Sequence, residues 1–249
     1  MSAGLAIITG GSSGLGLAVA RRLSADGWSV AITGRNPEAL DRAVAEIGRN
    51  CHGFAADVGD PAAMAEIVAR VNTDMGSVTA LVANAGTNVA KRAWSEVSSH
   101  DFSTVVDINV NGVFNAINAV LPGMRARRAG RIVAVSSFAG WHVTPQPGPA
   151  YTSSKMAVLG LIASLNMAEV RNGICATALC PGEIATPAMF RRVPPPTPEV
   201  LARMLQADDV ANAVAFILSQ PSRVAINELV ITPSRNNAYN RVPGPPFED

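Results

Sequence analysis

Short apolar segments of strand length alternate along the chain with segments whose apolar residues recur every three or four positions. This alternation is typical of repeated strand-helix units, in which helices cover both faces of a parallel sheet. The pattern therefore predicts an α/β fold with a doubly wound, parallel, seven-stranded sheet. We expect its strands near Leu5–Thr9, Ser29–Thr33, Cys51–Ala55, Thr79–Ala83, Arg131–Ser136, Ile174–Leu179 and Glu228–Ile231.

Capping residues and apolar periodicity together predict where the helices begin. Pro37 precedes Leu40, Val44 and Ile47 at helical spacing, and the pair Asp60-Pro61 precedes a similar apolar run. Asp is a favourable N-cap, and Pro is tolerated in the first helical turn. We expect further helices around Asp101–Ala126, Tyr151–Val170 and Asp208–Ser219.

Length and composition point to one folded domain over residues 1–249. Of the 249 residues, 48% are hydrophobic and 16% are charged, a balance that supports a large core and argues against long disordered stretches. The prolines of Pro194-Pro195-Pro196-Thr197-Pro198 break helices, so we expect a loop insertion at about 185–207. Prolines and missing periodicity predict an irregular tail at about 233–249.

Charge and residue usage narrow the partners. The formal net charge is +1, so no global field favours nucleic acid or an anionic membrane. There is no signal-peptide pattern and no run of eighteen apolar residues, which predicts a cytoplasmic protein with no membrane span. Three scattered cysteines are expected to be reduced thiols, and three histidines without ligand spacing predict no metal site.

A glycine-rich turn follows the first predicted strand. The residues Thr9-Gly10-Gly11-Ser12-Ser13-Gly14-Leu15-Gly16 lead directly into a helix. Glycines at such a turn let backbone amides approach a pyrophosphate at the positive end of the helix. The alternative is a plain flexible turn, but the position between the first strand and helix of a doubly wound chain favours nucleotide binding.

The spacing T-G-x-x-x-G-x-G resembles that of the short-chain dehydrogenase/reductase family. The resemblance continues through Asp57-Val58, Asn84-Ala85-Gly86, Asn109, Ser137, Tyr151-x-x-x-Lys155 and Pro181-Gly182, and covers about residues 4–232. It implies a single-domain Rossmann fold and an oxidoreductase that uses a nicotinamide cofactor. The cofactor contacts it implies lie at Gly10, Ser12, Ser13, Gly14, Leu15, Gly16, Arg35, Asp57, Val58, Asn84, Ala85, Gly86, Tyr151, Lys155, Pro181, Gly182, Ile184 and Thr186.

Cofactor choice is indicated at the end of the second strand, which reads Thr33-Gly34-Arg35. A protein that binds NAD is expected to place a carboxylate there for the ribose hydroxyls. The guanidinium of Arg35 instead suits a 2′-phosphate, with Ser12 or Ser13 as a second donor, so we expect NADP(H) rather than NAD(H). The alternative is that Arg35 is an ordinary solvated cation.

Tyr151 and Lys155 lie one helical turn apart, in a chain with only two tyrosines and two lysines. A phenol is a poor acid-base catalyst at neutral pH unless positive charge nearby favours the phenolate, and Lys155 would supply it. The resemblance implies that Ser137 polarises the substrate oxygen and that Asn109 kinks its helix and anchors a water to the lysine. Ser136 and Asn111 are close enough in sequence to be the alternatives.

By the same resemblance, Ile184 and Thr186 would hold the carboxamide of nicotinamide. Substrate-wall candidates are His142 and Phe190, together with Trp94, Trp141 and Val143, although each is as readily explained as a packing residue. We expect hydride transfer between NADP(H) and a carbonyl or secondary alcohol, with Tyr151 as general acid/base. A non-catalytic NADP(H)-binding redox sensor on the same fold is the alternative.

Two further expectations concern partners. An acyl-carrier-linked β-ketoacyl substrate is an option if the arginines at 125, 127, 128 and 131 lie near the pocket and meet an acidic carrier, although such a run is more often a solvated helix end.

The helices Asp101–Ala126 and Tyr151–Val170 are apolar over much of their circumference. A second apolar face predicts a homo-oligomer, a dimer or tetramer.

Overall fold

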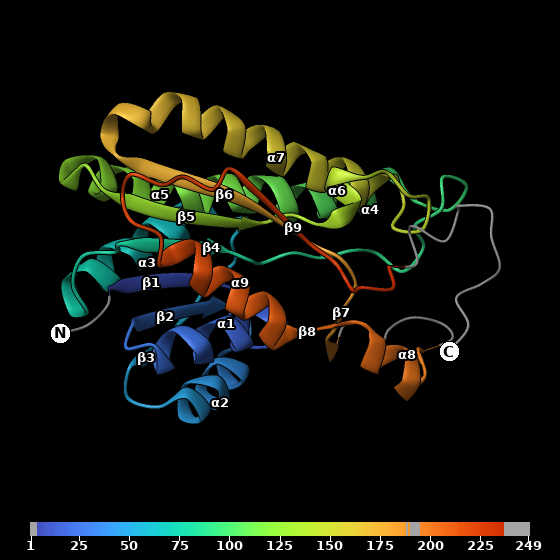
Figure 1. The fold of residues 1–249 in the computed structure, drawn as a ribbon, viewed down its shortest axis with the longest axis horizontal. Coiled ribbons are helices and arrows are strands. Elements are labelled where there is room, and N and C mark those ends of the chain that lie inside the picture. The colour runs from blue at the N-terminus through green and yellow to red at the C-terminus, as the bar shows by residue number, and fades with distance from the viewer. Residues whose placement is uncertain (1–3, 188, 190–194, 237–249) are drawn as a thin grey trace.

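The computed structural model describes residues 4–187, 189 and 195–236. Its main sheet is entirely parallel, with strand order β3-β2-β1-β4-β5-β6-β9 (Figure 1). The expected seven strands are all present, and β5 begins and ends one residue earlier than expected. The strands are β1 Leu5–Thr9, β2 Ser29–Gly34, β3 Cys51–Ala55, β4 Ala80–Ala83, β5 Gly130–Val135, β6 Ile174–Pro181 and β9 Glu228–Ile231.

Helices cover both faces of this sheet, as expected for a doubly wound Rossmann-like fold (Figure 1). On one face lie α1 Gly14–Ala25, α2 Pro37–Ile47 and α9 Ala207–Leu218. On the other lie α3 Pro61–Asp74, α4 Ser99–Val106, α5 Gly112–Arg127 and α7 Pro149–Glu169. Each layer encloses its own apolar cluster, and central strand residues such as Ile7 and Ile8 contribute alternately to the two clusters.

The predicted caps form where the sequence places them. Asp60 accepts hydrogen bonds from the backbone N–H groups of Ala62 and Ala63, and Pro61 occupies the first turn of α3. Asn36 caps α2 in the same way through the N–H of Ala39. These bonds satisfy helical amides that have no partner within the helix, so both helices start at fixed positions.

The stretch predicted as one helix over Asp101–Ala126 is interrupted. A π-helical segment, Asp107–Asn111, separates α4 from α5. By length and apolar composition alone, Ser99–Arg127 meets the minimum for crossing a membrane, and 44% of its apolar 18-residue window is buried inside the protein. A core helix that packs against a sheet meets the same criterion, and α5 packs against α3 and β4.

The predicted loop insertion at 185–207 contains regular structure, so that expectation was partly wrong. A two-stranded sheet pairs β7 Ile184–Ala185 with β8 Leu205–Gln206, and α8 spans Pro198–Arg203. Thr197 caps α8 and Pro198 occupies its first turn, where a missing N–H costs little. Phe190, residues 191–194 and most of the expected tail lie outside the described residues.

The strand order reverses between β1 and β4. In open parallel sheets, ligands bind outside the carboxyl ends of the strands at such a reversal. The glycine turn follows β1, Asn84 follows β4, and Ser136 and Ser137 follow β5. The short helix α6, Phe138–Trp141, then leads toward α7. The fold thus brings the sequence motifs together at the carboxyl ends of the strands.

Candidate active site

The glycine turn is shaped by close backbone approach. Gly10 and Gly14 have φ of +65° and +53°, which favour glycine. A Cβ on Gly16 would lie 2.2 Å from the carbonyl oxygen of Gly10, so this position accepts no side chain. Ser13 precedes α1 without a side-chain cap. The first amides of α1 are therefore left for an anionic ligand, and this cradle fits the pyrophosphate of a dinucleotide.

Asn84 ties the end of β4 to the glycine turn. Its Nδ2 donates to the carbonyl oxygens of Thr9 and Gly10 at 2.9 and 3.3 Å, and its own N–H donates to Thr9 Oγ1 at 3.0 Å. The N–H of Ala85 donates to the same hydroxyl. The side chain of Asn84 therefore holds two loops together, whereas Gly86 is exposed.

An open groove of about 450 Å³ lies between the turn that follows β3 and the helical segment around Asp107. Arg35 and Asp57 both line it, whereas Asn84, Ala85 and Gly86 do not. Arg35 is exposed, and Ser12 lies close to Gly34, with Oγ 3.2 Å from where a Cβ on that glycine would stand. Asp57 Oδ1 accepts from the N–H of Gly59 at 2.9 Å, and Val58 is buried beneath. The groove also carries two carboxylates that sequence reasoning missed, those of Asp60 and Asp107.

Asn109 lies at the centre of the π-helical segment and is fully buried. Its Oδ1 accepts from the N–H of Thr87 at 2.7 Å, and its Nδ2 donates to the carbonyl of Thr87 and to Ser154 Oγ. Asn111 instead is exposed and donates to Asp107 at 2.9 Å. The two asparagines therefore lie in different places: Asn109 contacts Thr87 and Ser154 in the interior, whereas Asn111 lines the groove with Arg35 and Asp57.

Tyr151 and Lys155 occupy the same face of α7. Lys155 is 3% exposed, and its Nζ donates to the carbonyl of Val135 at 2.8 Å and lies 5.7 Å from the centroid of the Tyr151 ring. Burial lowers the pKa of Lys155 to about 8. A buried ammonium loses its hydration, so the protonation equilibrium shifts toward the neutral amine.

Burial raises the pKa of Tyr151, and a hydrogen bond with Ser137 acts in the opposite direction. The sequence argument considered nearby positive charge and left out burial, which has a larger effect on the pKa of Tyr151 than its hydrogen bond with Ser137. The phenol is therefore a proton donor at neutral pH.

Ser137 and Ser136 follow the end of β5 and have different roles. Ser137 caps α6 by accepting from the N–H of Ala139 at 3.1 Å, and it also bonds with Tyr151. Ser136 is buried, and its hydroxyl donates to the backbone carbonyl of Lys155 at 2.7 Å. Only Ser137 touches the phenol, which favours it over the alternative. Sequence reasoning missed Cys180, whose buried thiol bonds with Ser136.

The segment expected at the nicotinamide starts at Pro181, the last residue of β6. Gly182 follows it, Ile184 belongs to β7, and Thr186 comes directly after β7. The N–H of Gly182 donates to the carbonyl of Ile231, which fixes the turn to the edge strand. Thr186 lies over the glycine turn, where a Cβ on Gly14 would stand 3.7 Å from its methyl group. The segment expected at the nicotinamide therefore lies against the glycine turn.

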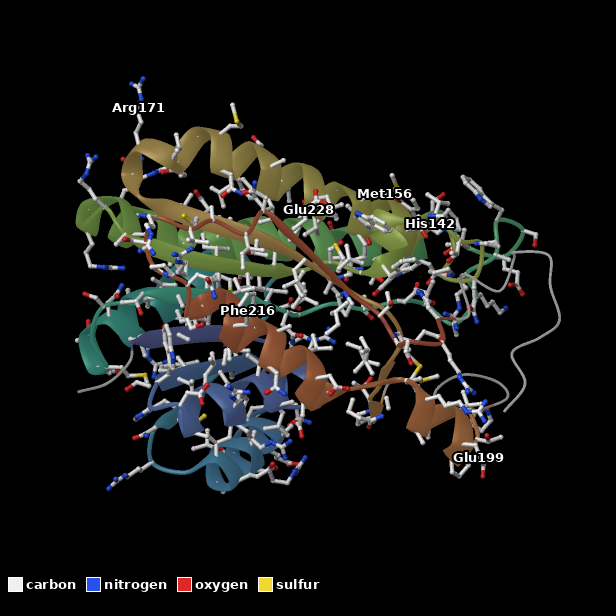
Figure 2. The ribbon with its side chains drawn as sticks, viewed as in Figure 1. His142, Met156, Arg171, Glu199, Phe216 and Glu228 are labelled. Atoms are coloured by element: carbon white, nitrogen blue, oxygen red, sulfur yellow. The ribbon has the colours of Figure 1, made fainter. Side chains whose placement is uncertain are left out.

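Aromatic residues gather at the start of α7. The ring of Phe138 lies 5.8 Å from that of Trp141 and 5.6 Å from that of His142, measured between centroids. His142 and Met156 both lie at this end of the helix (Figure 2). Trp141 and Val143 are exposed, at 49% and 63%, and Trp94 is 86% exposed. His142, an expected substrate-wall residue, is exposed and contacts the ring of Phe138, whereas Phe190 lies outside the described residues.

The arginines at 125, 127, 128 and 131 do not lie near the candidate active site, so the expectation that they meet an acidic carrier beside the pocket was wrong. They flank the start of β5, at the amino end of the strand. Arg128 donates to the carbonyl of Arg171, which lies at the end of α7 remote from His142 (Figure 2). Arg125 pairs with the buried Glu169, and Arg131 bonds to carbonyls near Pro221. These side chains bind the protein itself.

All three cysteines are free thiols. Within the described residues, no group of three or more His, Cys, Asp and Glu side chains is arranged to hold a metal ion.

Comparison with known proteins places this geometry in context. A family model described as short chain dehydrogenase matches residues 4–195. Among curated relatives, oxidoreductase UcpA of Escherichia coli (strain K12) is 36% identical, covering 87% of this chain and 88% of its own. Serine 3-dehydrogenase of Agrobacterium fabrum is 32% identical, covering 92% and 94%.

Solved structures give the same result. Levodione reductase superposes with a TM-score of 0.88 at 28% identity, covering 96% of this chain and 100% of its own. An alcohol dehydrogenase from the archaeon Thermococcus sibiricus, solved with 5-hydroxy-NADP, gives a TM-score of 0.82 at 27% identity, covering 93% and 97%.

Proposed function

Because this chain belongs to the short chain dehydrogenase family, we propose that it is an oxidoreductase that transfers a hydride between NADP(H) and a carbonyl or secondary alcohol substrate. The observation that carries the proposal is the grouping of Tyr151, Lys155 and Ser137 at the carboxyl end of the sheet, next to the glycine turn. This grouping provides a proton donor beside a dinucleotide cradle.

Each residue has a role in this proposal. Tyr151 donates the proton to the substrate oxygen during reduction and accepts it during oxidation. Ser137 holds the same oxygen, since its hydroxyl already bonds with the phenol. Lys155 supplies positive charge and contacts to the ribose, and Asn109 stabilises the backbone around Thr87. The cofactor, when bound, supplies or accepts the hydride.

The electrostatics favour the direction of reduction at neutral pH. Burial raises the pKa of Tyr151, so the phenol is protonated and ready to donate. Oxidation of an alcohol needs the phenolate, and its rate therefore rises with pH. A hydrogen-bond donor or a positive charge close to the phenol lowers its pKa, and so shifts the increase in oxidation rate to lower pH.

NADP(H) is our proposed cofactor. The end of β2 offers Arg35 and no acid, and Ser12 lies beside Gly34 as a second donor. The similar archaeal alcohol dehydrogenase was solved with an NADP analogue, which agrees with this choice. Three aspartates line the same groove, and their charge opposes a 2′-phosphate. Arg35 is therefore the decisive residue for NADP(H) over NAD(H).

A homo-oligomer in the cytoplasm completes the proposal. Large apolar side chains remain exposed on one helical layer, including Phe102 on α4, Phe114 on α5, and Met156 and Met167 on α7. A second copy covering this layer would remove them from water. The free cysteines are consistent with a reducing compartment.

The experiment is a panel of ketones, aldehydes and secondary alcohols, followed at the nicotinamide absorbance with NADP(H) and NAD(H) in turn. We expect turnover of at least one carbonyl compound and a preference for NADPH. Tight cofactor binding with no turnover of any member in either direction would instead favour the redox sensor. No binding of either cofactor would contradict both functions.

A further inference from the structure

The groove proposed for adenosine has two walls from separate parts of the chain. One wall is the turn that follows β3, and the other is the helical surface around the π-helical segment. The lining residues are Asp57, Gly59 and Asp60 on the first wall, Thr104, Asp107, Ile108 and Asn111 on the second, and Arg35 at the edge. The distance between these walls sets which planar ring fits between them.

One side chain bonds the two walls together. Asn115 lies on α5, one turn beyond Asn111, and its Nδ2 donates to the carbonyls of Val58 and Gly59 at 3.0 and 3.3 Å. Among the described residues that line the groove, no other hydrogen bond joins the two walls. Asn115 does not itself line the groove.

Packing reinforces the same junction. Val58 is 7% exposed, and a Cβ on Gly112 would lie 2.6 Å from its Cγ2. The turn and α5 therefore touch without an intervening side chain at Gly112. The carboxylate of Asp57 also stiffens the turn, because it accepts from the N–H of Gly59. The amide of Asn115 is thus bonded to a turn that is already short and rigid.

We propose that Asn115 is a positioning residue that sets the width of this groove and so determines how tightly the adenosine end of the dinucleotide binds. The inference rests on the proposed function, since it assumes that adenosine occupies the groove. Asn115 acts through the Asp57–Asp60 turn and touches neither the 2′ position nor the reacting atoms. Its effect therefore falls equally on NADPH and NADH, unlike that of Arg35.

The test compares three variants. Asn115→Ala removes the amide, and Asn115→Leu removes it while keeping the size of the side chain. Asn118→Ala is the matched control, because Asn118 is an exposed residue of the same helix with no side-chain hydrogen bond among the described residues. For each variant, calorimetry gives the Kd of NADPH, NADH and ADP, thermal melting gives the Tm, and assays give kcat at saturating cofactor.

We expect both Asn115 variants to raise all three Kd values by about tenfold, the scale of losing one or two hydrogen bonds that hold a binding surface. We expect kcat at saturating cofactor to stay within about twofold, because Asn115 bonds to the Val58–Gly59 turn and to none of the reacting side chains. Asn118→Ala should match the native protein in every measurement. A purely structural role would lower Tm and leave the Kd values unchanged, which would overturn the inference.

The outcomes separate this inference from the proposed function. If the native protein binds none of the three ligands, the proposed function fails. If the native protein binds them and the Asn115 variants bind equally well, only the inference fails. A loss confined to NADPH would also overturn it, because it would place Asn115 at the 2′-phosphate.

Discussion

Replacing Lys155 by methionine removes an ammonium that the fold holds away from water. Lys155 is 3% exposed, and its pKa falls from 10.5 to about 8 because of burial. The difference between these two values corresponds to about 3 kcal/mol of folding free energy for the protonated form. Between the two values the unfolded chain binds more protons than the folded one. The native protein therefore gains stability as pH rises from about 8 to about 10.5.

The variant lacks this titration, so its stability should not show that rise. Its absolute stability at neutral pH is a poorer readout, because the carbonyl of Val135 loses a donor at a cost of about 1–3 kcal/mol. The informative quantity is the difference between the two unfolding free energies as a function of pH. Groups remote from Lys155 cancel in that difference, whereas Cys180 does not, because Lys155 lowers its pKa.

Urea unfolding between about pH 7 and about pH 10.5 measures the difference. We expect it to change by about 3 kcal/mol in favour of the native protein as pH rises. Lys91→Met is the control, since Lys91 is the other lysine of the chain and is exposed. Its curve should run parallel to that of the native protein. If the stability of Lys155→Met also ran parallel to that of the native protein across this pH range, the lowered pKa of Lys155 would be refuted.

Three further predictions concern other parts of the molecule. Arg35→Ala should weaken NADPH binding by about 1–3 kcal/mol and leave NADH nearly unchanged, and equal losses in calorimetry would reject the 2′-phosphate contact. Arg125→Gln should lower stability by about 1–3 kcal/mol near neutral pH, because Glu169 is buried and keeps only Asn172 as a partner. Arg125 and Asn172 lower the pKa of Glu169, so the deficit, followed by urea unfolding, should shrink as pH falls and the carboxylate protonates; a deficit independent of pH would contradict this. Phe114→Asp should reduce the assembly seen by light scattering, whereas Phe216→Asp, equally exposed at 53% on α9, should retain at least the dimer; a native monomer would contradict the interface.

The strands and helix starts could be predicted from sequence because their causes are local. The cap at Asp60 acts within three residues, and the apolar period of α2 follows from one helical face. The Tyr151-Lys155 pair is likewise a local pattern on one helix. Such features do not depend on which distant segment packs against them.

The features that the sequence could not predict depend on distant contacts. The resemblance implied a kink at Asn109, but its π-helical form depends on bonds from this buried side chain to Thr87 and Ser154, which are remote in sequence. The arginines near β5 looked available until the structure gave each of them a partner within the protein. The pKa of Tyr151 depends on burial, which no pattern of residue types reports. The bond from Asn115 to the turn after β3 has no signal in the sequence.

The most direct test of the proposed function is Tyr151→Phe, measured for turnover and for cofactor affinity on the same preparation. The phenyl ring fills the same space, so the variant removes the proton donor and leaves the contacts of Lys155 in place. With a substrate from the panel, we predict that turnover falls by at least ~100-fold while the Kd of NADPH changes little. Turnover close to that of the native protein would contradict the role of Tyr151.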